Sequence, residues 1–146
     1  MNDVSLNISD EEISGVAWTE VVASDGTTKY WYLWTGGNGP HNNGKNVYNF
    51  PLNAGSATMF QASFTGQLSN DYEFVSFFSS DSGEITGAIN ANHDLIDVTN
   101  QQNQFGDYYW GVFVRPRGQT GPTFLCDPVI SNRRISPAKG SSSQEP

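Results

Sequence analysis

The alternation of hydrophobic and polar residues is clearest over residues 16–34, where two runs rich in β-branched and aromatic residues flank Ser-Asp-Gly-Thr. An Asp-Gly pair between such runs is the strongest short-range signal for a β-hairpin. Its type I′ turn requires positive φ at both central residues, here Asp25 and Gly26. With these two residues at the tip, the facing pairs are Val22 with Lys29, Glu20 with Trp31, Trp18 with Leu33, and Ala17 with Trp34.

Both faces of this hairpin are aromatic. Because side chains alternate along a strand, one face holds Trp18, Val22, Trp31 and Leu33, and the other holds Val21, Tyr30, Tyr32 and Trp34. A strand with one solvated face needs only one apolar face. The hairpin is therefore either covered on both sides or leaves one aromatic face for a ligand or partner.

Further strands are predicted at intervals of roughly 8–15 residues, separated by turns rich in Gly, Asn, Ser and Pro. They cover residues 47–52, 57–65, 72–78, 85–89, 95–98, 105–114 and 123–126, with 129–130 as a continuation. No stretch has a convincing helical period. The pattern predicts an all-β fold, a single antiparallel β-sandwich or jelly roll of about eight to ten short strands.

The same alternation groups side chains by face within these strands. The set that is expected to point into the core is Phe60, Ala62 and Phe64. In the strand at 72–78, one side carries Tyr72, Phe74, Ser76 and Phe78. In the strand at 105–114, one face carries Tyr108, Trp110, Val112 and Val114.

The length of 146 residues is that of one domain. Residues 13–134 are predicted to form the β-sandwich. Residues 1–12, in which apolar and polar positions alternate, are expected to be an edge strand or an N-terminal arm. The segment 135–146 is rich in Ser and Pro and is expected to be a disordered tail.

The chain is acidic, with a formal net charge of −8. Over residues 1–114, 13 carboxylates are opposed only by Lys29 and Lys45, which argues against a nucleic-acid partner because phosphate binding needs a basic face. No apolar run has the length of a transmembrane segment. Met1 is followed at once by polar residues, so a cytoplasmic location at synthesis is expected, with export by another route left open.

Catalytic motifs are missing, and the chain is predicted not to be an enzyme. The only histidines are His41 and His93, and no nucleophile elbow, zinc-binding pair or phosphate-binding Gly-Lys loop occurs. Cys126, the single cysteine, lies in a strand-like run where a thiol packs as a small hydrophobe. No organic cofactor is expected.

A calcium site is the one metal site that the sequence allows. Asp94 and Asp97 follow Asn90 and Asn92 in an oxygen-rich segment, and hard cations bind several converging oxygens. An Asx-rich turn that satisfies its own backbone has the same composition, so this alternative stays open.

Carbohydrate binding is the function that the sequence favours. Tyr and Trp offer apolar faces with polar tips, and neighbouring Asn, Asp and Gly residues supply directional hydrogen bonds. A lectin-like module for a carbohydrate or glycoprotein is predicted, with the candidate ligand-binding residues Tyr32, Trp34, Asn38, His41, Asn43, Asp107 and Tyr109. Of these, Trp34 and His41 are expected to be exposed, because they lie at a junction between strand and loop. Burial in the core is the competing interpretation for each aromatic residue.

A family resemblance supports the alternative function. Residues 46–55 and 69–75, together with Asp107-Tyr-Tyr-Trp and Cys126-Asp-Pro-Val-Ile, resemble the bacterial inclusion-body protein family. The resemblance covers less than half of the chain and implies a cytoplasmic β-sandwich that self-associates as a homo-oligomer, without catalytic residues. The chain departs from that family in its opening strand and in having Cys126 where an aromatic residue precedes Asp-Pro.

Overall fold

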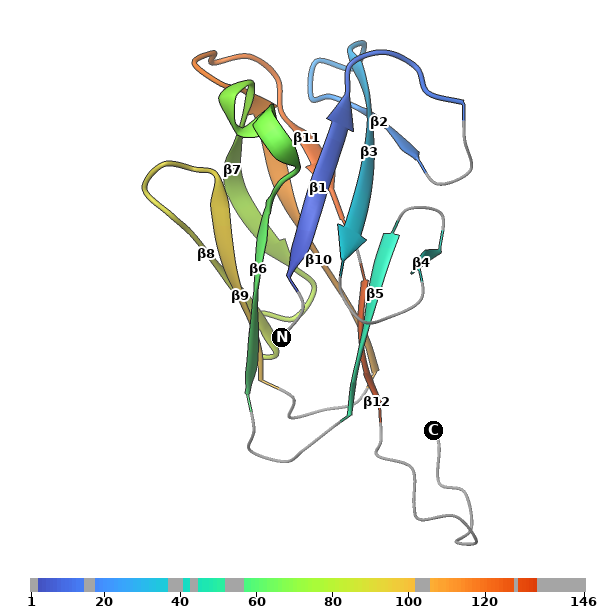
Figure 1. Cartoon of the computed structure of the whole chain (residues 1–146), viewed down its shortest axis with the longest axis vertical. Coiled ribbons are helices and arrows are strands. Elements are labelled where there is room, and N and C mark those ends of the chain that lie inside the picture. Colours follow the sequence, from blue (N-terminus) through green and yellow to red (C-terminus); the bar gives the residue numbers. More distant parts are fainter. Residues whose placement is uncertain are drawn as a thin grey trace, which may run out of the picture.

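The structure is a computed structural model that describes residues 3–14, 18–36, 41–42, 45–51, 57–101, 106–127 and 129–133. Side chains are described for 3–14, 18–36, 57–101 and 108–127. The predicted tail, 135–146, lies outside the described residues. Within them the chain forms twelve strands and one 3-10 helix, so the predicted all-β class is confirmed (Figure 1).

The strands follow one another along the whole described chain. In order they are β1 (Val4–Ser9), β2 (Thr19–Val22), β3 (Lys29–Gly36), β4 (His41–Asn42), β5 (Lys45–Pro51), β6 (Thr58–Phe64), β7 (Tyr72–Ser79), β8 (Ile85–Ile89), β9 (Leu95–Asn100), β10 (Gly106–Pro116), β11 (Phe124–Cys126) and β12 (Val129–Arg133). The helix η1 (Gly66–Asn70) connects β6 to β7.

Two sheets form a sandwich-like arrangement (Figure 1). The first has the order β2-β3-β1-β6-β9-β8, and the second has the order β11-β10-β12-β5-β4, with β7 paired to β10. Most neighbours are antiparallel, but β1 with β6 and β12 with β5 run parallel, which corrects the expectation of a wholly antiparallel fold. Parallel neighbours need a long connection, and several strands separate the members of each pair along the chain.

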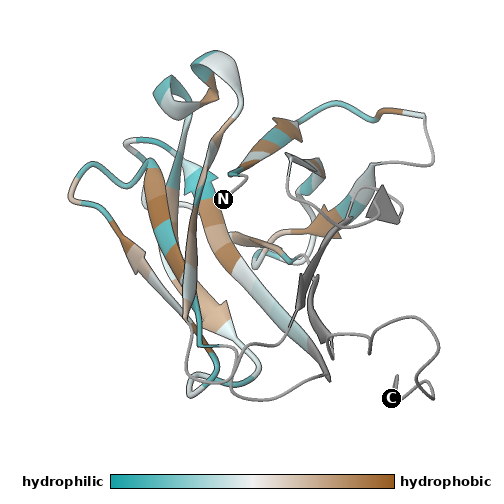
Figure 2. Ribbon diagram, turned by 60° about the horizontal axis from the view of Figure 1, so that its bottom comes forward, coloured by the Kyte–Doolittle hydropathy of each residue, from teal (hydrophilic) through white to brown (hydrophobic). Residues whose placement is uncertain are grey.

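The core between the sheets is mainly aromatic. Hydrophobic residues recur along the strands with the period of two that Figure 2 displays as alternating bands. Across the two sheets, the Trp34 and Trp110 rings lie 5.2 Å apart between centroids, and the Tyr30 and Phe124 rings stack at 4.0 Å. The predicted inward set on β6, Phe60, Ala62 and Phe64, is buried.

The hairpin of β2 and β3 has the predicted register. Val22 pairs with Lys29, and Glu20 pairs with Trp31. The turn differs from the type I′ expectation, because of the two tip residues only Gly26 has positive φ, at 80°. The Gly26 N–H donates to the Ala23 carbonyl at 2.9 Å. The loop is still centred between Asp25 and Gly26, so the register of the hairpin is the predicted one.

Asp25 stabilises this loop through its side chain, which removes the need for positive φ at that residue. Its carboxylate accepts hydrogen bonds from the Thr27 N–H and Thr28 N–H, both at 2.9 Å, and from the Thr28 hydroxyl at 2.5 Å. Short Asp side chains compete with the backbone in this way and define an Asx turn. The hydrogen bonds of the Asp25 side chain therefore stabilise a turn that differs from the type I′ turn expected from the Asp-Gly pair alone.

These hydrogen bonds predict an acid-sensitive hairpin. The Thr28 hydroxyl and then the Thr27 and Thr28 N–H groups lower the pKa of Asp25 from 3.8 to about 2. Because the folded-state pKa is the lower one, the stabilisation is present above about pH 4 and disappears as pH falls toward 2. NMR titration of the folded protein should give an Asp25 pKa of about 2, and Thr28→Val should move it toward 3.8. A value near 3.8 in the unmodified chain would contradict the proposed turn.

The N-terminal strand is internal, which corrects the expectation of an edge strand or arm over 1–12. β1 pairs with β3 on one side and with β6 on the other. Its apolar residues Val4, Leu6 and Ile8 are buried in the core. Period-two alternation is the same for an edge strand and for an internal strand with one solvated face, so the pattern alone does not reveal strand order.

A bulge in β7 changes which aromatic residue reaches the core. The pairing with β10 jumps from Phe113–Ser76 to Val114–Phe74, so Val75 has no partner in the ladder. One extra residue reverses the faces that follow it. Phe77 therefore packs against the core, whereas Phe78 is 39% exposed, and the predicted grouping of Phe78 with Phe74 is wrong.

Candidate functional site

The two aromatic residues expected at the centre of a ligand site lie in the core. Tyr32 is 2% exposed and Trp34 is 1% exposed, so the prediction that Trp34 is on the surface is wrong. The inner face of β3 packs on the second sheet, where Trp34 meets Trp110 and the Tyr32 hydroxyl donates to Asp127 Oδ1 at 2.8 Å. Burial, followed by the negative charge of Asp127, raises the pKa of Tyr32 and keeps the phenol neutral.

The other predicted ligand-binding residues do not complete a site with these two. Tyr109 is 53% exposed on β10, on the opposite side of that strand from the core. His41 on β4 and Asp107 on β10 are described by backbone alone, and Asn38 and Asn43 lie outside the described residues. The sequence-based site therefore divides between the core and the outer surface of the second sheet.

The predicted calcium ligands are held by separate hydrogen bonds. Both oxygens of Asp94 accept amide protons, from Asn90 Nδ2 at 2.6 Å and from Asn92 Nδ2 at 2.8 Å, and these bonds lower the pKa of Asp94. Asp97 lies on β9 and accepts from Gln61 Nε2 at 2.9 Å. Among the side chains described, no group of three or more His, Cys, Asp or Glu is placed to hold a metal ion. The calcium site stays a prediction.

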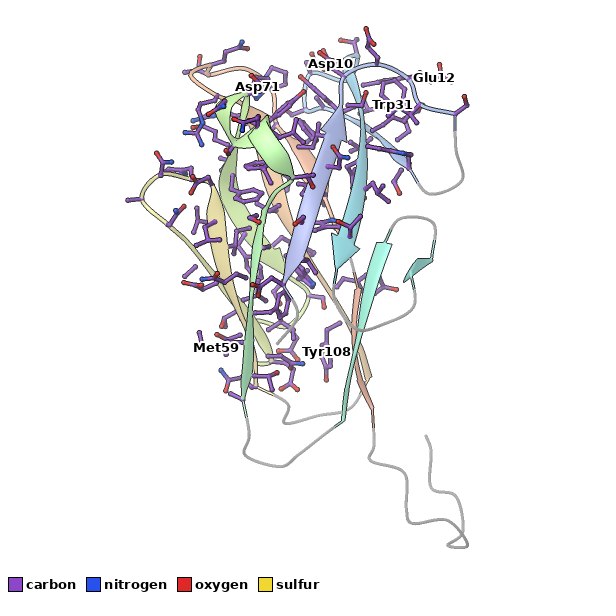
Figure 3. The ribbon with its side chains drawn as sticks, in the orientation of Figure 1. Asp10, Glu12, Trp31, Met59, Asp71 and Tyr108 are labelled. Carbon is purple, nitrogen blue, oxygen red and sulfur yellow. The ribbon has the colours of Figure 1, made fainter. Side chains whose placement is uncertain are left out.

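A cavity of about 590 Å³ opens at the end of the molecule where β1 ends and β3 and β7 begin. This volume lies within the range of roughly 300–1,000 Å³ that is typical of small-molecule sites. Figure 3 shows two of its carboxylates, Asp10 and Asp71, at this end. The lining residues come from four separate segments and are Ile8, Ser9, Asp10, Tyr30, Leu68, Asp71, Tyr72, Pro116 and Gln119.

Two buried tyrosines are fixed in this cavity by a cluster of rings. Tyr30 is 7% exposed and stacks on Phe124, and Tyr72 is 8% exposed and meets Phe124 edge-on at 6.3 Å. The two tyrosine rings also contact each other edge to face, with centroids 6.3 Å apart. Such an arrangement leaves each ring little freedom and sets the position of its hydroxyl group.

The hydroxyl groups of these tyrosines are available to a ligand. Neither Tyr30 nor Tyr72 makes a hydrogen bond through its side chain to any described residue. Burial and then the charge of Asp10 raise the pKa of Tyr72 to about 12, and the same two causes raise the pKa of Tyr30. Both phenols are therefore neutral near pH 7 and can donate as well as accept a hydrogen bond.

The rim of the cavity is held by backbone hydrogen bonds. The Asp71 N–H donates to the Leu68 carbonyl at 2.9 Å and closes η1, while the Arg117 N–H donates to the Asp71 carbonyl at 2.8 Å. The second bond joins the start of β7 to the loop that carries Gln119. The acidic side chain of Asp71 is thus presented from a fixed backbone.

Comparisons with known proteins identify no family, so the functional assignment rests on the geometry of this cavity. No protein-family model and no curated protein matches the chain. Across the described residues, no helix is long and apolar enough to cross a membrane. The lining of the cavity is mostly polar, with neutral phenols, carboxylates and an amide, and suits non-covalent binding of a polar molecule.

Sequence reasoning missed this cavity. The grouping of Tyr30 with Tyr32 and Trp34 on one hairpin face is correct, but Asp10, the pair Asp71-Tyr72 and Gln119 lie in three further segments with no common motif. The only signal was that each of them stands next to a predicted strand end or turn. Without the order of strands, nothing identifies which of the many turns share one end of the sandwich.

Proposed function

We propose that the chain is a non-catalytic recognition domain that binds a carbohydrate in the cavity between Asp10 and Gln119. The observation that carries this proposal is a pair of tyrosine hydroxyls that line a cavity of suitable size and have no hydrogen-bond partner among the described residues. A neutral phenol both donates and accepts, so two open hydroxyls that line one cavity offer hydrogen bonds to a polar ligand.

The remaining lining supports a sugar rather than a flat or purely apolar ligand. Carboxylates and the Gln119 amide can accept and donate hydrogen bonds to a ring of hydroxyl groups. Ile8, Leu68 and Pro116 supply apolar contacts for the C–H groups of the sugar. The candidate site therefore moves from the loop after β3, where the sequence placed it, to the opposite end of β3.

Binding of glycans by the purified protein tests this proposal. A glycan array followed by calorimetry should show saturable binding, and Tyr72→Phe should weaken it about fivefold to tenfold, since one hydrogen bond is lost while the ring remains. Tyr109→Phe is the matched control, because Tyr109 is exposed on the outer face of β10. A loss in the Tyr109 variant alone would move the site to that outer face.

Self-assembly is the second candidate function. Phe78 pairs with Gly111, two residues from Tyr109 on the same strand, so these two exposed aromatic side chains share the outer face of the second sheet. Exposed apolar side chains on a sheet favour association, as the resemblance to inclusion-body proteins also implies. A folded sample that binds no glycan, and whose sedimentation shows growth with concentration, would favour this function over carbohydrate binding.

A further inference from the structure

The described lining of the cavity is negatively charged and contains no basic side chain. Asp10 and Asp71 are exposed at its rim, and none of the described residues that line it is basic. The neighbouring Arg117 uses its side chain elsewhere, donating from Nε to the Ser69 carbonyl at 2.8 Å and from Nη2 to the Asn92 carbonyl at 3.0 Å. Its third contact is with a carboxylate oxygen of Glu73 at 3.8 Å.

Both rim carboxylates are free to bind a ligand. Neither the Asp10 nor the Asp71 side chain makes a hydrogen bond or an ion pair within the described part of the chain. The charge of Asp10 also acts on both buried tyrosines, since it is the largest cause after burial of the raised pKa of Tyr30 and Tyr72. Asp10, Tyr30 and Tyr72 all line the same cavity, so the carboxylate and the phenols face a common space.

We infer that this space selects a ligand with a protonated amino group, which on the proposed function makes an amino sugar with a free ammonium group the substrate class. This inference rests on the proposed carbohydrate binding. An ammonium group has three donors and needs acceptors, which the two carboxylates and the phenol oxygens provide. A hydroxyl and an ammonium can both donate to a carboxylate, but only the ammonium adds the attraction between opposite charges, so it gains more here than a hydroxyl.

Three matched sugars test the inference. Calorimetry at pH 6 and low salt compares glucosamine, whose amino group is then protonated, with glucose and with the neutral N-acetylglucosamine. Glucosamine should bind at least about tenfold more tightly than either, because one charge-assisted hydrogen bond supplies about that factor. The preference should shrink as salt is raised, since both rim carboxylates are exposed.

Charge-removing variants assign the effect to the rim. Asp10→Asn and Asp71→Asn should each weaken glucosamine binding about tenfold and glucose binding clearly less, because the asparagine amide oxygen still accepts a hydrogen bond from a hydroxyl group. Glu20→Gln is the control, because Glu20 is an exposed carboxylate on β2, away from the cavity lining, and pairs with Lys29 at 3.7 Å. Thermal melts of the three variants show that each one is folded.

The outcomes separate this inference from the proposed function. Equal affinity for the three sugars would overturn the selection for an amino group while carbohydrate binding stands. Binding of ethanolamine that depends on Asp10, with no sugar bound, would support the charge selection and overturn the proposed function. A folded protein that binds neither sugar nor amine would overturn both.

Discussion

Replacing Trp34 with alanine is expected to lower the free energy of unfolding by about 3–5 kcal/mol. Trp34 is 1% exposed and is among the largest fully buried side chains, with its ring against Trp110 of the opposite sheet. Removing it leaves a cavity in the core and deletes contacts between the two sheets. Since domains of this size are stable by only about 5–15 kcal/mol, most of the margin would be lost.

Urea unfolding followed by circular dichroism measures this loss. Trp31→Ala is the matched control, because Trp31 has the same side chain on the opposite face of β3 and is only partly buried. Its variant should lose clearly less stability. A loss of less than about 1 kcal/mol in Trp34→Ala would be typical of a surface substitution and would contradict the packing described here. Any loss of ligand binding in this variant reports unfolding rather than a contact with ligand.

Trp34 also illustrates what the sequence could predict about the hairpin. The pairing of Val22 with Lys29 follows from the position of the turn and is correct. The sequence could not show which face of the hairpin points into the core, because both faces are aromatic and the alternation of side chains is the same for either choice. The partner that decides it, Trp110, lies on the other sheet and is distant in the sequence.

The bulge in β7 shows a second limit of sequence patterns. Val75 lacks a partner opposite β10, and the faces reverse after it. Because Phe77 and Phe78 are adjacent and equally apolar, either can fill the core, and the sequence pattern is consistent with both. The bulge in the pairing of β7 with β10 determines that Phe77 points inward.

The cavity depends on strand pairing, which explains why single segments did not reveal it. The pairing of Ser9 with Trp31 brings the end of β1 beside the start of β3, and the pairing of Pro116 with Tyr72 brings the end of β10 beside the start of β7. Each of these ends contributes lining residues. The chemistry of the residues was visible in the sequence, but their meeting point was a property of the topology.

A second large loss of stability is expected from Gly36→Ala. Gly36 has φ +90°, and a Cβ atom there would lie 2.2 Å from the Asp3 carbonyl oxygen and 3.2 Å from Val4 Cα. The left-handed conformation costs a residue with a Cβ about 1–2 kcal/mol. Overpacking against backbone adds about 1–3 kcal/mol. The free energy of unfolding should therefore fall by about 2–5 kcal/mol in urea.

Gly26→Ala separates the two causes of this loss. Gly26 has a similar φ of +80°, but nothing lies within 4 Å of a Cβ atom at that position, so its variant should show the conformational cost alone, about 1–2 kcal/mol. The excess loss in Gly36→Ala then measures how tightly the start of β1 is held against the end of β3. If both variants lose the same stability, that close approach does not exist in solution. A larger loss at Gly36 would instead confirm that backbone contact holds the start of β1 against the end of β3.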